Sequence, residues 1–171
     1  MQRLSVHLAQ ETPDDWWEVE ALYDLCFAPG RTALSSYRLR DGVPPVPNLC
    51  WTARDPDGVL AGAIRCWPVY VGREVAVLLG PVAVHPTRQG EGIAALLMHK
   101  AIDTAYYGGW SRMLLVGDLP YYRRFGFDKI DGVIMPPPTN PDRVLGLPLK
   151  DKAWDRVRGT VRKADDCISI G

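Results

Sequence analysis

The order of apolar and polar residues predicts a short strand from Leu4 to Ala9 followed by a helix, because the apolar period changes from two residues to three or four. Thr12 can cap this helix, and Pro13 fits its first turn. The apolar positions that recur at helical spacing are Trp16, Val19, Leu22 and Tyr23. We therefore expect a strand that leads directly into an amphipathic helix.

The middle of the chain holds three strand-like runs joined by short turns. The first ends at Arg54, a DPDG turn leads into the run from Val59 to Val71, and the third extends from Arg73 to Val84. Successive strands with such short turns form an antiparallel meander. Pro81 lacks an N–H group and follows Gly80, which disfavours regular ladder pairing, so we expect a bulge there.

A second helical pattern follows, and the glycines Gly108 and Gly109 end it. Its apolar face consists of Ile93, Leu97, Ala101 and Ala105, with His99 and Asp103 opposite. The run SRMLLVGD is then typical of a buried strand parallel to the preceding one, and LPYYRRFGF predicts a short helix that ends at Gly126. The expected fold class is α/β, with a mixed, mostly antiparallel sheet and helices on both faces.

Two regions carry weaker patterns. Residues 28–48 are rich in Pro and Gly and hold at most one short helix, from Leu34 to Leu39, so they indicate a long connection. The region after Phe127 offers one or two further strands, and beyond Lys150 the pattern predicts little. Long connections in compact domains are often functional.

Length and composition limit the classes of protein to consider. A chain of 171 residues with 47% hydrophobic residues fits one domain, residues 1–171. Basic and acidic residues number 20 each, so no positive field favours nucleic acid. The four cysteines follow neither zinc nor disulfide spacing, which indicates reduced thiols and no metal. Without a leader-like segment or a long apolar run, we expect a cytoplasmic protein and no membrane partner.

The segment HPTRQGEGIAALLMHKAI, His85 to Ile102, places Gly90 and Gly92 directly before the second helix. A helix N-terminus cleared of side chains offers backbone N–H groups and the positive end of the helix dipole, which suits a phosphate or pyrophosphate. Two other interpretations are a tight turn and a dinucleotide-binding GxGxxA turn with Asp118 as the ribose-binding acid. The preceding meander and the late position of the glycines, after Pro86, disfavour the dinucleotide interpretation.

Two motifs stand at separate places in the chain. The pattern (Q/R)xxGx(G/A) is matched by Gln89, Gly92 and Ala94, and the pattern YxxxGF is matched by Tyr122, Gly126 and Phe127. Together they resemble the GNAT superfamily of N-acetyltransferases, and most closely its YhbS-like branch. The resemblance covers about residues 48–129. The sequence departs from the family at Ala94, where glycine is commoner, and at Asp118, where many members have asparagine.

The resemblance implies that acetyl-CoA is the cosubstrate. Its pyrophosphate would lie on the amides from Gln89 to Ala95, and its pantetheine arm would run beside the strand that ends at Val84. The cofactor-binding residues implied are Val82, Val84, Arg88, Gln89, Gly90, Glu91, Gly92, Ile93, Ala94 and Ala95.

Acetyl transfer to an amine needs a neutral amine, a polarised thioester and a proton for the departing thiolate. Alkyl amines and thiols have pKa values near ~10.4 and ~8.5, so proton transfer has to be assisted. By the motif match, Tyr122 is the predicted donor to the thiolate. Candidates for the base are Glu74, Asp118 and His85, and water that relays the proton to solvent is a further alternative.

We therefore expect an N-acetyltransferase that works by direct attack in a ternary complex. The alternative is a non-catalytic acyl-CoA-binding sensor module. The acceptor, a small molecule or a protein, has to bear an amine, and residues 28–48 and the region after Phe127 are expected to shape its pocket. A homodimer is one alternative for the assembly.

Overall fold

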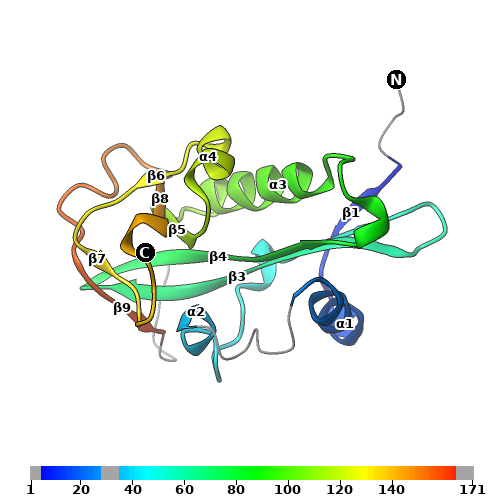
Figure 1. Ribbon diagram of the computed structural model, residues 1–171, viewed down its shortest axis with the longest axis horizontal. Coiled ribbons are helices and arrows are strands. Elements are labelled where there is room, and N and C mark those ends of the chain that lie inside the picture. Colours follow the sequence, from blue (N-terminus) through cyan, green and yellow to red (C-terminus); the bar gives the residue numbers. More distant parts are fainter. Residues whose placement is uncertain (1–4, 28–34, 165–171) are drawn as a thin grey trace.

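The computed structural model describes residues 5–27 and 35–164, which form a nine-stranded sheet with helices on both faces (Figure 1). The helices of this part of the chain are α1 (Trp16–Cys26), α2 (Ser35–Arg38), α3 (Ile93–Tyr107) and α4 (Leu119–Tyr122). In Figure 1, α3 and α4 lie above the sheet, and α1 and α2 lie below it. This is the mixed α/β architecture that the sequence predicts.

The strands of the sheet follow the order β1-β2-β3-β4-β5-β8-β6, and β9 pairs with both β3 and β7. Their bounds are β1 (His7–Gln10), β2 (Trp51–Arg54), β3 (Leu60–Val71), β4 (Glu74–Val84), β5 (Arg112–Val116), β6 (Asp128–Lys129), β7 (Val133–Ile134), β8 (Val144–Pro148) and β9 (Gly159–Lys163). Pairing is antiparallel except between β4 and β5 and between β7 and β9. The predicted meander and the parallel crossover through α3 are both confirmed.

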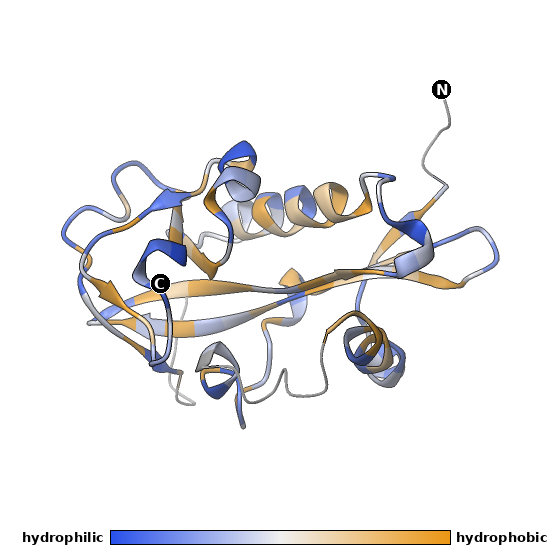
Figure 2. Cartoon of the chain, in the orientation of Figure 1, coloured by the Kyte–Doolittle hydropathy of each residue, from blue (hydrophilic) through white to orange (hydrophobic). Residues whose placement is uncertain are grey.

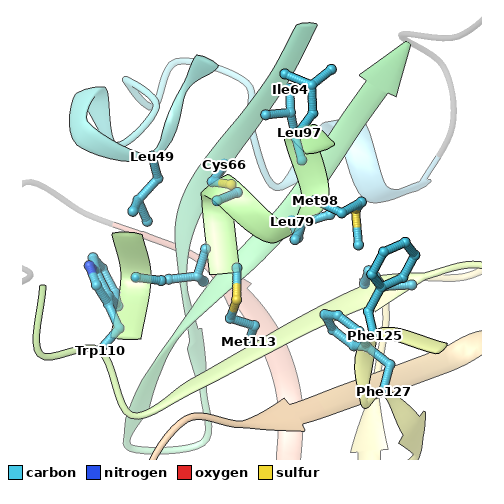
Figure 3. Packing of buried hydrophobic residues seen from close by; sticks show 14 of the residues in the cluster. Leu49, Ile64, Cys66, Leu79, Leu97, Met98, Trp110, Met113, Phe125 and Phe127 are labelled. Carbon is cyan, nitrogen blue, oxygen red and sulfur yellow. The ribbon is translucent and has the colours of Figure 1, made fainter. Parts of the chain in front are cut away.

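The apolar face of α3 forms the main core with the sheet, as the hydropathy colouring in Figure 2 and the packed side chains in Figure 3 show. Leu97 is fully buried in this core, and burial of such a side chain stabilises a fold by roughly 1.5–3 kcal/mol. His99 and Asp103 lie on the exposed side of the helix, as predicted. Burial of this face fixes α3, and with it the loop that precedes the helix.

The ends of the helices follow the local signals in the sequence. A 3₁₀ turn, Pro13–Asp15, precedes α1, and the backbone N–H of Thr12 donates to the Asp15 carboxylate at 2.8 Å. At the other end of α3, the N–H of Gly108 donates to the Thr104 carbonyl at 2.9 Å. Both predicted boundaries are confirmed.

The structure differs from the sequence prediction mainly at the two ends of the chain. Strand β1 begins at His7, and Leu4, where we expected it to begin, lies outside the described residues. Strand β9 was not predicted, because Val161 is its one fully buried apolar residue and leaves no clear period. Pairing with β3 at Val69–Val71, rather than local pattern, forms this strand.

The cysteines that the structure describes are free thiols. Burial raises the pKa of the Cys50 thiol to about 11, and burial likewise raises the pKa of Cys66 well above its usual value. Cys26 is half-buried, and Cys167 lies outside the described residues. Because the thiolate is the nucleophilic form, Cys50 and Cys66 are poor candidates for an acyl-enzyme.

Candidate active site

Strands β4 and β5 separate halfway along β4. They pair in parallel only where Val77 and Leu78 lie opposite β5. On its other side β4 stays paired with β3 as far as Val84. From Leu79 onward, one edge of β4 therefore has no strand beside it in the described part of the chain, and an extended ligand can pair with that edge.

A bulge marks the point where the strands separate. Ile64 pairs with Val82 and Cys66 pairs with Leu79, so β4 carries one extra residue at Gly80–Pro81. The bulge predicted from these two residues is confirmed. Gly80 has a φ of +115°, a conformation that residues with a side chain rarely adopt.

Side chains from the α1–α2 face hold the bulge. The Tyr23 hydroxyl donates to the Pro81 carbonyl at 2.8 Å, and Arg40 Nη2 donates to the Gly80 carbonyl at 3.1 Å. Bulges leave backbone groups out of the strand ladder, and such groups need other partners when they are buried. The bulge is thus fixed from one face of the sheet.

The two glycines before α3 form a turn in the left-handed region. Gly90 has a φ of +83°, and Gly92, the N-cap of the helix, has a φ of +85°. A side chain at Gly90 would meet no atom within 4 Å, so backbone conformation and not packing requires glycine there. The first helical bond runs from the N–H of Leu96 to the Gly92 carbonyl at 3.2 Å, which leaves the preceding N–H groups of α3 available to an anion.

Two side chains fix the loop that leads to these glycines. The His85 ring nitrogen Nδ1 accepts from the Thr87 backbone N–H at 3.2 Å, and Gln89 Nε2 donates to the Val84 carbonyl at 3.0 Å. His85 therefore serves as a cap of the loop in this structure. The Gln89 side chain joins the end of β4 to the glycine turn.

The other predicted cofactor residues surround this turn. Arg88 and Glu91 form an exposed ion pair, with Nε and Oε2 separated by 2.7 Å, and the hydrogen bond from Arg88 lowers the pKa of Glu91. Ile93 is buried in the core, so only its backbone can reach a ligand. Ala94 and Ala95 are half-buried and small, which keeps the helix N-terminus open.

Tyr122 lies in α4, next to the gap between β4 and β5. Its ring packs edge-to-face on Phe127, with the ring centroids 6.3 Å apart. A side chain at Gly117 would collide with the Tyr122 ring, so this glycine makes room for the tyrosine. Burial raises the pKa of the Tyr122 phenol above its usual value, which keeps the hydroxyl protonated at neutral pH.

A cavity of about 190 Å³ connects Tyr122 with the bulge. Residues Leu78–Val82 of β4 line it, together with Tyr37 and Arg40 from the α2 side of the sheet. A second cavity, of about 520 Å³, lies on the α1–α2 face, and Tyr37, Arg40 and Pro81 line both cavities. The gap between the strands is therefore lined from both faces of the sheet.

The predicted bases lie in different places. Asp118 precedes α4, and its carboxylate is exposed and 3.9 Å from Arg143 Nη1. Glu74 is the first residue of β4, six positions before Gly80, and its carboxylate lies 3.7 Å from Arg112. The structure thus brings Asp118 beside the helix of Tyr122 but does not bring Glu74 to the cavity.

Comparison with known proteins adds the family to this geometry. Residues 16–127 match the model of the acetyltransferase (GNAT) family. The chain belongs to the GNAT acetyltransferase family. Since the match covers the sheet from β2 to β5, α3 and the YxxxGF motif, it includes the whole site described above.

One relative, YhbS of Escherichia coli, is similar to this GNAT protein over most of its length, both in sequence and in structure. The GNAT protein is 31% identical over 121 residues to YhbS of Escherichia coli strain K12, described as an uncharacterized N-acetyltransferase, over 69% of this chain and 71% of YhbS. The structure of Escherichia coli YhbS in complex with CoA matches with a TM-score of 0.81 and 26% identity, covering 96% of this chain and 92% of YhbS. The resemblance to the YhbS branch is confirmed.

A second solved structure has the same architecture. A GNAT family acetyltransferase from Brucella melitensis, in complex with acetyl-CoA, matches with a TM-score of 0.70 and 27% identity. The match covers 93% of this chain and 96% of the Brucella chain. The α/β fold class is therefore that of GNAT enzymes.

Two residues of the site have no signal in the sequence of this GNAT protein. Arg40 stands in an irregular segment where an arginine usually points to solvent, and Gly117 resembles an ordinary glycine after a strand. Only the tertiary contacts with Gly80 and with the Tyr122 ring show what these residues do. Residues 36–38 and 40–45 line the two cavities, and their role in an acceptor pocket stays a prediction.

The described residues hold neither a metal-binding cluster nor a membrane-spanning helix. In residues 5–27 and 35–164, no group of His, Cys, Asp or Glu side chains is placed to hold a metal ion. No helix in this part of the GNAT protein has the length and apolar character that crossing a membrane requires.

Proposed function

We propose that this GNAT protein transfers the acetyl group of acetyl-CoA to a primary amine, by direct attack within a ternary complex. The observation that carries the proposal is the cavity of about 190 Å³, which joins the open edge of β4 to Tyr122 and is lined from both faces of the sheet. A thioester and an amine that approach from opposite faces can meet there.

The cosubstrate site proposed here uses backbone groups. The pyrophosphate would accept from the N–H groups of the glycine turn and the first turn of α3, where the helix dipole also favours an anion. The pantetheine arm would pair with the edge of β4 at Val82 and Val84, since no strand of the described residues occupies that edge. The complexes of YhbS with CoA and of the Brucella protein with acetyl-CoA support acetyl-CoA as the cosubstrate.

In the proposed reaction, the neutral amine nitrogen attacks the thioester carbon and forms a tetrahedral intermediate. The C–S bond then breaks, and the thiolate takes the proton of the Tyr122 hydroxyl, which yields free CoA. The acetylated nitrogen loses one proton, and Tyr122 regains one, so the reaction converts an amine and acetyl-CoA into an amide and CoA. The position of Tyr122 in the lining of the cavity of about 190 Å³ supports its role as the acid, and its raised pKa keeps the proton on the hydroxyl until the thiolate departs.

For the base, we propose solvent water rather than a side chain. Glu74 lies away from the cavity, His85 already accepts a hydrogen bond within its loop, and the Asp118 carboxylate is exposed. On this proposal, Asp118→Asn reduces turnover by less than about tenfold, which is below the usual contribution of a general base.

The test is to mix the protein with acetyl-CoA and a panel of primary amines, and to measure both free thiol and acetylated amine. We expect equal amounts of the two products for at least one amine. Melting temperatures with CoA and with NAD are measured in parallel, because a ligand that binds only the native state raises the melting temperature. A shift with CoA but no turnover would indicate the sensor module, and a shift with NAD alone would restore the dinucleotide interpretation.

A further inference from the structure

Arg40 lies where the two cavities meet, since it lines both. Its Nη2 donates to the Gly80 carbonyl at 3.1 Å, whereas Nε and Nη1 are buried and have no hydrogen-bond partner among the described residues. A guanidinium carries a permanent positive charge and five N–H donors. When it is buried, its charge and its donors need partners, because an unpaired buried charge is unfavourable. Arg40 is thus a cation between the two cavities, and its Nε and Nη1 donors have no hydrogen-bond acceptor in the described part of the chain.

Packing rather than a counter-charge holds Arg40 in place. Its guanidinium carbon lies 4.7 Å from the centroid of the Tyr37 ring and 5.5 Å from that of the Trp67 ring. The Trp67 indole is itself fixed, because its N–H donates to the Val43 carbonyl at 2.8 Å. Aromatic rings cover the faces of a guanidinium and leave its N–H edges free for a planar anion.

Burial lowers the pKa of Arg40 to about 10, so the side chain stays protonated at neutral pH. The other buried cation of the larger cavity, Arg65, is already paired with Glu11 at 2.9 Å and with Glu20 at 3.0 Å. Arg38 and Asp41 also line this cavity, but both are exposed to solvent. Arg40 is therefore the desolvated positive charge that an incoming anion would meet.

We propose that Arg40 binds a carboxylate of the acceptor, so that the acceptor is an amine that also carries a carboxylate, as an amino acid does. This inference rests on the proposed acetyl transfer. Arg40 reaches the cavity from the α2 side of the sheet, whereas the glycine turn for the cosubstrate leads into α3 on the other side (Figure 1). An anion bound to Arg40 is thus part of the acceptor and not the pyrophosphate.

A carboxylate fits this position better than other acceptor groups. It is planar and presents two oxygens to one edge of a guanidinium, which gives shorter and stronger hydrogen bonds than a neutral carbonyl does. A carboxylate also supplies the negative charge that no carboxylate of the described residues places beside Arg40. Bound in this way, the amino acid would direct its amine toward the gap between β4 and β5, where Tyr122 lies.

The experiment compares amino acids with their primary carboxamides as acceptors. The pairs are glycine and glycinamide, β-alanine and β-alaninamide, and L-phenylalanine and L-phenylalaninamide, with rates corrected for the fraction of neutral amine. We expect kcat/KM to favour the acid of the best pair by roughly 10-fold to 100-fold, as for loss of one hydrogen-bonded charge. Ethanolamine and O-phosphoethanolamine form a further pair that tests phosphate as the anion.

Variants of Arg40 show whether this residue causes the preference. Arg40→Met should remove the preference for the acid to within about threefold, and Arg40→Lys should retain part of it because the charge remains. The matched control is Arg162→Met. Arg162 Nη2 also donates to a glycine carbonyl, that of Gly72 at 2.9 Å, and its guanidinium lies 5.1 Å from the Tyr70 ring, but the residue is exposed and lines neither cavity. This variant should keep the parent's preference.

Several results would overturn the proposal. The first is an equal kcat/KM for acid and amide in the parent, and the second is a preference for the acid that persists in Arg40→Met. The third is a kcat/KM for O-phosphoethanolamine that exceeds that of every amino acid tested. An equal loss for both series in Arg40→Met would assign Arg40 to the thioester oxygen instead, which also overturns it.

Failure of the transfer reaction can be distinguished from failure of this inference. If no amine is acetylated, the melting temperature of the CoA-bound protein is measured with each acid and amide. A shift with the acids alone that disappears in Arg40→Met supports the carboxylate site although transfer has failed. No shift with any acid overturns the site as well.

Discussion

Two arginines line the same cavity on the α1–α2 face, and they differ in what surrounds the guanidinium. Arg65 forms a two-bond pair with Glu11, at 2.9 and 3.0 Å, donates to Glu20 at 3.0 Å, and packs on the Trp16 ring at 3.7 Å. Arg40 has one backbone carbonyl and two aromatic rings as neighbours, and no carboxylate among the described residues.

The pKa values of the two arginines differ as well. Burial by itself lowers the pKa of both arginines, but in Arg65 the hydrogen bond to Glu11 and the charge interactions with Glu11, Glu20 and Tyr23 together outweigh burial, and the pKa rises. In Arg40 burial dominates, and the pKa falls to about 10. A buried charge that the fold has paired serves stability, whereas one left without an acceptor marks a place where a ligand completes the structure. We call Arg65 and its partners Glu11 and Glu20 the closed region, because their charges are already paired. We call Arg40, the bulge and Tyr122 the open region, because a ligand can still bind there.

Changes in the open region should affect turnover and spare stability, and the largest such effect is expected for Tyr122→Phe. Loss of the hydroxyl should reduce kcat by about 10²-fold to 10⁴-fold, while acetyl-CoA affinity and the melting temperature stay near those of the parent. Because burial raises the pKa of the Tyr122 phenol, the parent should lose activity only as pH rises through a value above the usual ~10.

The measurement for Tyr122→Phe is kcat against pH, with thioesters of more and less acidic thiols. The variant should gain more than the parent from an acidic leaving thiol, since such a thiolate needs no proton. Parent-like turnover with a rate-limiting chemical step would instead return Tyr122 to a packing role.

Changes in the closed region should lower the stability of the fold and leave turnover little affected. Arg65→Met leaves the buried Glu11 carboxylate without a partner and should destabilise the fold by about 3–5 kcal/mol, or roughly 6–20 °C in melting temperature. The same substitution at Arg40 removes a charge that has no carboxylate partner and leaves only the Gly80 carbonyl without its donor, so it should cost about 1–2 kcal/mol. Urea and thermal unfolding measure both. Equal losses would show that the two arginines do not differ as the comparison requires.

Two glycines with the same backbone conformation, one in the proposed cosubstrate site and one outside it, allow a matched comparison of binding and stability. Gly90 and Gly58 have φ values of +83° and +84°, and a side chain at either would meet no atom within 4 Å. Valine should therefore strain both turns equally, by roughly 1–2 kcal/mol. Only Gly90→Val should weaken acetyl-CoA binding, by about tenfold or more, because Gly58 lies in the turn between β2 and β3. Titration calorimetry checks this, and the same affinity in both variants would mean that Gly90 only shapes its turn.

The smallest effect is expected at the exposed ion pair beside the glycine turn. Glu91→Gln removes a carboxylate beside the glycine turn and releases Arg88 from its ion pair, so acetyl-CoA affinity should rise by about twofold to fivefold. The gain should shrink in high salt, since the charges are exposed. Weaker binding at low salt would indicate that the ion pair itself shapes the loop.

The sequence predicted those parts of the protein whose cause is local. The glycine turn, the start of α3 and the bulge at Gly80–Pro81 follow from the backbone preferences of Gly and Pro within one stretch of chain. The motif that contains Tyr122 is likewise contiguous. The predicted roles of Tyr122 and of the cofactor residues remain predictions until they are measured.

The remaining parts depend on contacts between distant segments. Arg40 is 40 positions away from Gly80, so nothing in its own neighbourhood indicates that it is buried. Glu74, one of the candidate bases, is the first residue of β4, and strand direction places it at the end of β4 far from the bulge. Strand β9 exists because Val69–Val71 of β3 offer an edge. Patterns of polarity record burial of an element, not the identity of its partner.

The most direct test of the account is a titration of the ¹⁵N-labelled protein with acetyl-CoA, followed by the backbone amide resonances. The account predicts that the amides of residues 89–95 and of Leu79, Gly80 and residues 82–84 of β4 shift most and saturate together. The amides of Arg65 and of its partners Glu11 and Glu20 stay unchanged. Saturating shifts elsewhere, with residues 89–95 unmoved, would contradict the proposed cosubstrate site.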